Sequence, residues 1–225
     1  MPLFIVPIIA LFIVFIVIGA IRSAQLAKAR TEGMQALSQK LGLQFAGEKD
    51  HSFDERYPFI EKLCSGKNRY GFNVLQGLYQ GQQVYVFDYH YETTSRDSKG
   101  KRKTSHHYFS FMILHHHGNF PELIICREGY FSKMAQFFGF DDIDFESSEF
   151  SRQFLVKSPK KKFAYDVCHS GMIEYLLANQ DLNIQIENDV LTLFFPRRLD
   201  FDQIEYDLQR LLKVRALFPD YLLQN

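Results

Sequence analysis

The sequence predicts an α+β protein in which an N-terminal transmembrane helix precedes a soluble domain of antiparallel hairpins with packed helices. Three observations predict this class. Residues 1–21 carry no charged side chain, the later apolar segments alternate with period two and come in pairs, and aromatic residues make up 16% of the 225 residues. Paired alternating segments favour antiparallel sheets, and an aromatic-rich composition suits a sheet with a filled apolar face.

Residues 1–21 form the expected membrane anchor. From Leu3 to Ile21 the residues are apolar throughout, and a helix of this length comes close to spanning the roughly 30 Å hydrocarbon core of a bilayer. The alternative is a cleaved signal peptide, but no basic segment precedes the apolar run and the run is longer than such peptides need. We therefore expect a single-pass protein whose residues 3–21 contact the lipid bilayer.

The basic residues after the span predict its orientation. Arg22, Lys28 and Arg30 follow the apolar run, and the first acidic residue is Glu32. Positive charge flanking a span favours retention of that side in the cytoplasm. The predicted location is therefore the inner (cytoplasmic) membrane, with the soluble domain in the cytosol.

The segment after the anchor predicts a juxtamembrane helix and then a sheet-rich lobe. Residues 22–42 have helix-favouring composition and end at Gly42, a frequent helix stop. The lobe is expected to cover residues 43–140. Its predicted elements are a short strand at 43–45, a brief helix ending at Gly66, a hairpin of 72–79 and 84–91 joined by QGQQ, strands at 108–114 and 123–127, and a helix at 131–138.

The acidic stretch DDIDFESS, residues 141–148, predicts a division into two lobes, with an α+β lobe over residues 141–225. The apolar spacing in this second part predicts further alternating strands and helices. The expected elements are a strand at 150–156, helices at 161–168 and 171–179, a hairpin of 182–186 and 191–195 turning at Asn188 and Asp189, and a final helix at 201–217 capped by Asp200.

The last third of the chain resembles a group of uncharacterised bacterial proteins. The runs that carry the resemblance are FSRQF, KKFAYDV, MIEYLL, LTLFF and RLDFDQIEYDLQRLL, all C-terminal to Phe145. These proteins are single-pass membrane-anchored and have a C-terminal domain of unknown function. The resemblance implies membrane anchoring and carries over no catalytic residue.

The charge of the chain points to a local rather than a global electrostatic function. Lys plus Arg and Asp plus Glu both number 26, so we expect no nucleic-acid partner. The loop between residues 92 and 105 nevertheless concentrates cations, which we predict to bind an anionic membrane surface or a partner protein. A solvated hairpin tip is the alternative. The predicted binding residues are Arg96, Lys99, Lys101, Arg102 and Lys103.

We expect no metal site, and two histidines are the nearest to a pair of ligands. His115 and His117 would share one face of a strand about 6.6 Å apart, although two imidazoles without a carboxylate make an incomplete site. His106 lies about 30 Å from His115 along an extended strand, which excludes it from that site. The sequence contains no cofactor-binding motif, so we expect no cofactor.

These features favour a membrane-tethered cytosolic binding or scaffold domain that contacts the anionic membrane surface or a partner protein. The alternative is a membrane-bound enzyme whose site is assembled from residues distant in sequence. Its candidate residues are Asp88, His90 and His115. The sequence leaves the choice between binding and catalysis open.

Overall fold

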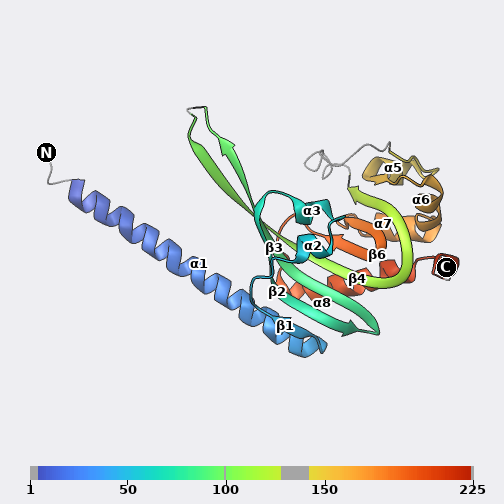
Figure 1. The fold of residues 1–225 in the computed structure, drawn as a ribbon, viewed down its shortest axis with the longest axis horizontal. Helices are drawn as coiled ribbons and strands as arrows, with labels where there is room; N and C mark the ends of the chain where they lie inside the picture. Colours follow the sequence, from blue (N-terminus) through green and yellow to red (C-terminus); the bar gives the residue numbers. More distant parts are fainter. Residues whose placement is uncertain (1–4, 99, 128–141, 224–225) are drawn as a thin grey trace.

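The computed structural model describes residues 5–98, 100–127 and 142–223. It consists of one long N-terminal helix and a six-stranded antiparallel sheet with helices on both faces (Figure 1). The elements in chain order are α1 (Ile5–Leu41), β1 (Gln44–Ala46), α2 (Phe53–Arg56), α3 (Glu61–Cys64), β2 (Lys67–Tyr79), β3 (Gln82–Arg96), β4 (Arg102–Arg127), α5 (Ser148–Gln153), β5 (Phe154–Lys157), α6 (Lys161–Val167), α7 (Ser170–Ala178), β6 (Ile184–Phe194), α8 (Phe201–Ala216) and the short 3-10 helix η1 (Asp220–Leu222).

Helix α1 joins the predicted anchor and the predicted juxtamembrane helix in one unbroken element. Its apolar side chains from Leu11 to Ile21 are exposed, Phe12 to 67%. Among the described residues, it is the one helix that is long enough and apolar enough to cross a membrane. Its C-terminal half is instead docked on the domain, since Met34 is buried and Lys40 forms an ion pair with Glu205 of α8.

The sheet has the order β1-β2-β3-β4-β5, and β6 also pairs with β4. The predicted hairpin of β2 and β3 is confirmed, and Gln80 and Gly81 turn it with φ of 50° and 80°. Two consecutive residues with positive φ give the turn whose twist matches the strands it joins. Strands β3 and β4 stay paired as far as Arg96 and Arg102, so their hairpin projects well beyond the rest of the sheet (Figure 1).

Three predictions differ from the structure in the extent or the kind of element. The separate strands at 108–114 and 123–127 are parts of the single strand β4, and the predicted hairpin around Asn188 is the single strand β6. Asn188 has φ of 55° and lies opposite Phe120, where the register between β4 and β6 shifts. Asparagine tolerates this left-handed conformation, so the residue serves an irregularity within a strand rather than a turn. The predicted strand at 150–156 begins as helix α5, because the Ser147 side chain caps it by accepting from the Phe150 N–H.

The sheet buries both faces, in two separate cores. Val84 and Val86 of β3 join a core formed with α1 and α5 to α8, whereas Phe87 and Tyr89 join a second core with α2 and α3. Tyr85, Phe87, Tyr89 and Tyr91, which alternate along β3, all lie in or against the second core.

The sheet runs across the boundary predicted near residue 141, because β4 pairs with both β5 and β6. The structure accordingly does not show two lobes. The helix predicted at 131–138 lies outside the described residues.

Candidate functional site

The docked part of α1 is held to the sheet by a buried ion pair. Arg30 Nε donates to Asp88 Oδ2 at 2.6 Å and Arg30 NH2 donates to Oδ1 at 2.7 Å. Asn73 and Ser110 also donate to this carboxylate, at 3.2 and 3.0 Å. Because Asp88 is fully buried and four donors face its two oxygens, the arrangement fixes the position of α1 over β3.

A groove of about 610 Å³ lies between α1 and the sheet, on the anchor side of this ion pair. We call it the anchor groove. Helix α1 contributes the stretch where its apolar segment ends, and strands β2 and β4 contribute aromatic side chains. The residues that line it are Gly19, Arg22, Ser23, Leu26, Ala27, Arg30, Gly47, Lys49, Tyr70, Phe72, Tyr108 and Arg198.

The anchor groove combines exposed cations with aromatic rings. Lys49 Nζ lies 4.2 Å from the centroid of the Tyr70 ring, and Arg198 Cζ lies 5.1 Å from that of Tyr108. Arg22 is exposed at the end of the apolar segment of α1. None of the described residues that line the groove is acidic. This combination suits a ligand with an anionic head and an apolar body.

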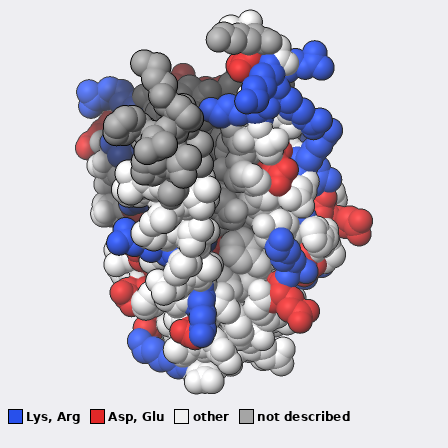
Figure 2. Space-filling view, turned by 90° about the vertical axis from the view of Figure 1, so that its left-hand side faces the viewer, with Lys and Arg blue, Asp and Glu red and all other residues white. Residues whose placement is uncertain are grey.

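The predicted basic hairpin lies at the projecting tip of β3 and β4. Arg96, Lys101, Arg102 and Lys103 are exposed there, and Lys99 lies outside the described residues. The tip and the N-terminal half of α1 extend from the domain on the same side (Figure 1). Figure 2 views the molecule from that side and shows Lys and Arg side chains gathered along its upper edge, over the hairpin.

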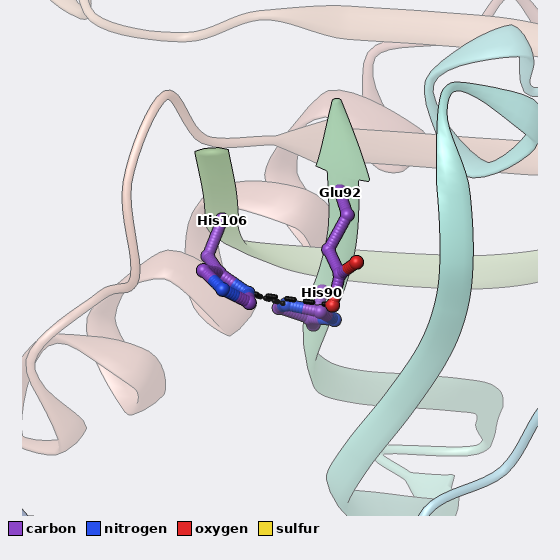
Figure 3. Close-up of side chains that lie close together, drawn as sticks. All are labelled: His90, Glu92 and His106. Carbon is purple, nitrogen blue, oxygen red and sulfur yellow. Dashed lines mark hydrogen bonds and ion pairs between the residues drawn. The ribbon is translucent and has the colours of Figure 1, made fainter. Parts of the chain in front are cut away.

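Three possible metal ligands converge near the base of the same hairpin (Figure 3). His90 Nε2 lies 3.1 Å from His106 Nδ1, which lies 3.5 Å from Glu92 Oε1. All three ligand atoms are within 4.8 Å of one another, and this is the one such group found in the described part of the chain. We call these residues the histidine cluster. The sequence interpretation considered His90 and His106 separately and missed the pair.

The surroundings of the histidine cluster hold His90 in place. Its ring is almost completely buried and packs against Tyr70 and Tyr108, with centroid distances of 4.6 and 4.8 Å. Burial lowers the pKa of His90, so the ring is neutral at physiological pH. Asn68 donates to Glu92 Oε1 at 2.7 Å, which orients the carboxylate.

The structure does not bring His115 and His117 into a three-ligand group in the residues it describes. The ring nitrogens of His115 instead contact Asp189 Oδ2 at 2.8 Å and the Tyr57 hydroxyl at 3.0 Å, while His117 is exposed. The sequence interpretation assigned Asp189 to a turn and so missed the carboxylate beside His115.

The residues named for an enzyme do not converge on one site. Asp88 and His90 point to the face of the sheet that α1 covers, where Asp88 binds Arg30. His115 contacts Tyr57, a member of the core on the other face. The sheet therefore separates His115 from the other two.

A second cavity, of about 660 Å³, lies among α5, α6 and α7. Phe145, Tyr165 and Ile173 line it together with the carboxylates of Asp144 and Glu174, and no cation is among its described lining residues. It lies on the opposite side of the domain from the N-terminal half of α1 (Figure 1). The anchor groove is therefore the better candidate for a site that works at a membrane.

Comparison with known proteins gives a likeness of fold. No protein-family model matches the chain, and no curated protein matches it either. Among solved structures, it is similar to the crystal structure of the mycobacterial trehalose monomycolate transport factor A, TtfA, with a TM-score of 0.59 and 11% sequence identity. The likeness covers 84% of this chain and 96% of that one. It supports the α+β class with an antiparallel sheet, whereas the resemblance to uncharacterised bacterial anchored proteins stays a prediction.

Proposed function

We propose that this chain is a membrane-anchored module whose anchor groove binds the head group of an anionic lipid. The observation that carries the proposal is the composition of the groove, where exposed Arg22, Lys49 and Arg198 surround aromatic rings at the end of the apolar segment of α1. Cations recognise the phosphate of a lipid, and aromatic rings are favoured at the level of head groups because they have an apolar body and a polar edge.

The height of the anchor groove along α1 supports a lipid rather than a soluble anion as the ligand. Gly19 and Arg22 both line the groove, and the uncharged segment ends between them at Ile21. When the residues before Arg22 lie in the hydrocarbon core, the groove opens at the level of the head groups. A lipid phosphate then meets the cations while its acyl chains stay beside the exposed apolar surface of α1.

The basic hairpin adds a second contact in this proposal. Arg96, Lys101, Arg102 and Lys103 reach the membrane surface on the same side as α1, and each cation near an anionic surface contributes about 1 kcal/mol. The positive flank of the anchor supports a cytosolic domain on the inner membrane, where these cations face the lipid surface. TtfA is named for the transport of trehalose monomycolate, a lipid, and the similar fold supports a role beside membrane lipids.

The test compares lipid retention by two variants of the full-length protein. Each is reconstituted in nanodiscs of phosphatidylcholine and phosphatidylglycerol and then extracted in mild detergent, and the retained lipid is counted by native mass spectrometry. We expect the wild type to retain phosphatidylglycerol selectively. The groove variant, Arg22→Gln with Lys49→Gln and Arg198→Gln, should lose at least nine-tenths of this retention.

The matched control removes three exposed cations far from the anchor, with Lys160→Gln, Lys161→Gln and Lys162→Gln. It has the same net charge as the groove variant and should retain phosphatidylglycerol like the wild type. Equal retention by the groove variant and the control would overturn the proposal, and so would a wild type that retains both lipids without preference.

A further inference from the structure

The histidine cluster is built by the register of the β3–β4 hairpin. Glu92 lies directly opposite His106, and His90 lies opposite Tyr108. His90 and Glu92 are two residues apart on β3, so their side chains lie on the same face of the sheet. The pairing thus places His106 of β4 beside His90 and Glu92 of β3, although His106 follows Glu92 by 14 residues in the sequence.

The hydrogen bonds of His90 determine which of its nitrogens carries a lone pair. Nδ1 lies 3.1 Å from the Asn68 carbonyl oxygen, which only accepts, so Nδ1 holds the proton. In a neutral ring Nε2 is then unprotonated, and Nε2 faces His106 and Glu92. Metal-binding histidines are commonly oriented in this way, by a backbone carbonyl at the other ring nitrogen.

We propose that His90, Glu92 and His106 bind one Zn²⁺ ion. The ligands are His90 Nε2, His106 Nδ1 and Glu92 Oε1, and water completes the coordination. Two imidazoles with one carboxylate form a donor set that Zn²⁺ accepts. With bonds of about 2.0–2.1 Å in a tetrahedral site, neighbouring ligand atoms lie roughly 3.3 Å apart. Two of the observed separations, 3.1 and 3.5 Å, bracket this value, and the third pair of ligand atoms lies within 4.8 Å.

The three residues differ in freedom in a way that permits metal entry. His90 is fixed by burial, whereas the His106 side chain is 54% exposed. Its proton can therefore exchange from Nδ1 to Nε2 through water, which leaves the Nδ1 lone pair for the ion. The charge of Glu92 favours a cation. The charge of Lys49 disfavours a cation at this site, because the Lys49 ammonium group lies near His90, over the Tyr70 ring. A hydrogen bond between two neutral imidazoles gives the same 3.1 Å contact without a metal. A titration with Zn²⁺ distinguishes a metal site from this hydrogen bond.

A Zn²⁺ ion here goes beyond lipid binding. It would join β3 to β4 at the base of the basic hairpin, and Asn68 would extend this connection to β2 through both His90 and Glu92. The ion would therefore stiffen the part of the hairpin that carries the tip.

The experiment titrates tag-free, full-length protein in detergent with Zn²⁺ in competition with a chromophoric chelator. We expect one equivalent to bind. His106→Ala should weaken binding at least 100-fold, and Glu92→Gln about 10-fold. These two side chains are partly exposed, so both variants should fold. His117→Ala, which removes another exposed histidine of β4, is the matched control and should bind like the wild type.

Substitution with Co²⁺ supplies an independent readout. A tetrahedral site with two imidazoles should give visible absorption at one equivalent in the wild type and in His117→Ala, and this absorption should be lost in His106→Ala. Absence of saturable binding at one equivalent would overturn the proposal. Binding that survives His106→Ala would overturn it as well, because the ion would then lie elsewhere.

Discussion

Arg30 of α1 and Asp88 of β3 form a bidentate ion pair, with N–O distances of 2.6 and 2.7 Å, although they are 58 residues apart in the sequence. The carboxylate is fully buried, and Arg30 also donates to the Leu199 carbonyl oxygen at 2.6 Å. One side chain thus connects the membrane anchor, the central sheet and the segment before α8. The anchor and the domain form a single body at this point.

Removing Arg30 should therefore destabilise the domain and loosen the anchor. In Arg30→Met the buried carboxylate of Asp88 loses its charged partner, which costs about 3–5 kcal/mol of unfolding free energy. Denaturant unfolding in detergent measures the loss, and hydrogen exchange of residues 22–41 should become faster. Lys28→Met is the control, since the Lys28–Glu32 pair is exposed and worth little. Equal stability of the two variants would contradict this role of the ion pair.

Acid should destabilise the protein through His116. Burial is the main cause that lowers the pKa of this ring to about 4, whereas in the unfolded chain it is about 6.5. The folded state keeps the neutral form, so stability is full above pH 6.5 and falls as the pH drops toward 4. The loss amounts to about 3 kcal/mol.

The measurement for His116 is the unfolding free energy at pH 7 and pH 4 in wild type and His116→Gln. The wild type should lose about 3 kcal/mol more than the variant over this range. Carboxylates that titrate in the same range act equally in both proteins and cancel in the difference. Parallel pH profiles would show that the folded protein accommodates a charged His116.

Gly66 should tolerate no side chain. Its φ is +67°, and an added Cβ would lie 2.4 Å from the Glu92 carbonyl oxygen. We expect Gly66→Ala to cost about 2–4 kcal/mol, from left-handed strain together with displacement of the β3 backbone. Gly81 provides the comparison, because its φ is +80° but nothing lies within 4 Å of its added Cβ. Thermal unfolding should show a clearly smaller loss for Gly81→Ala, about 1 kcal/mol. Similar losses would mean that the Glu92 backbone moves away at little cost.

The basic hairpin should touch anionic but not neutral lipid. The chain contains no tryptophan, so Ser98→Trp at the exposed tip gives a single reporter of its surroundings. In nanodiscs with phosphatidylglycerol its emission should shift to the blue and be quenched by brominated lipid, and 0.5 M salt should reverse both effects. Replacing the five cations with Gln in this background should abolish them. The same emission in anionic and neutral nanodiscs would contradict a contact between the tip and anionic lipid.

The sequence predicted those parts of the fold that local patterns determine. The uncharged run at the N-terminus and the helical pattern after it combine in α1, and QGQQ turns the β2–β3 hairpin. Asn188 shows the limit of such reasoning. Its preference for positive φ serves a turn and a strand irregularity equally well, and only the pairing of β6 with a shifted segment of β4 distinguishes the two.

The candidate sites were harder to predict because their residues meet across strands. His106 was compared with His115 of its own strand, whereas its neighbours are on β3. A signal was present, since a hairpin that pairs Arg96 with Arg102 also places Glu92 and His106 opposite each other. For Arg30 no comparable signal exists. Its position next to the span indicates topology, and its buried partner Asp88 is revealed only by the packing of α1 on the sheet.

The unbroken course of α1 has a mechanical consequence. Because the membrane half and the docked half belong to one helix, a tilt of the first half turns the whole domain with it. A thinner bilayer makes a span of fixed length tilt further, and the β3–β4 hairpin, which projects beyond the rest of the sheet, then moves with the helix. The height of its tip above the lipid surface would thus report the thickness of the surrounding bilayer.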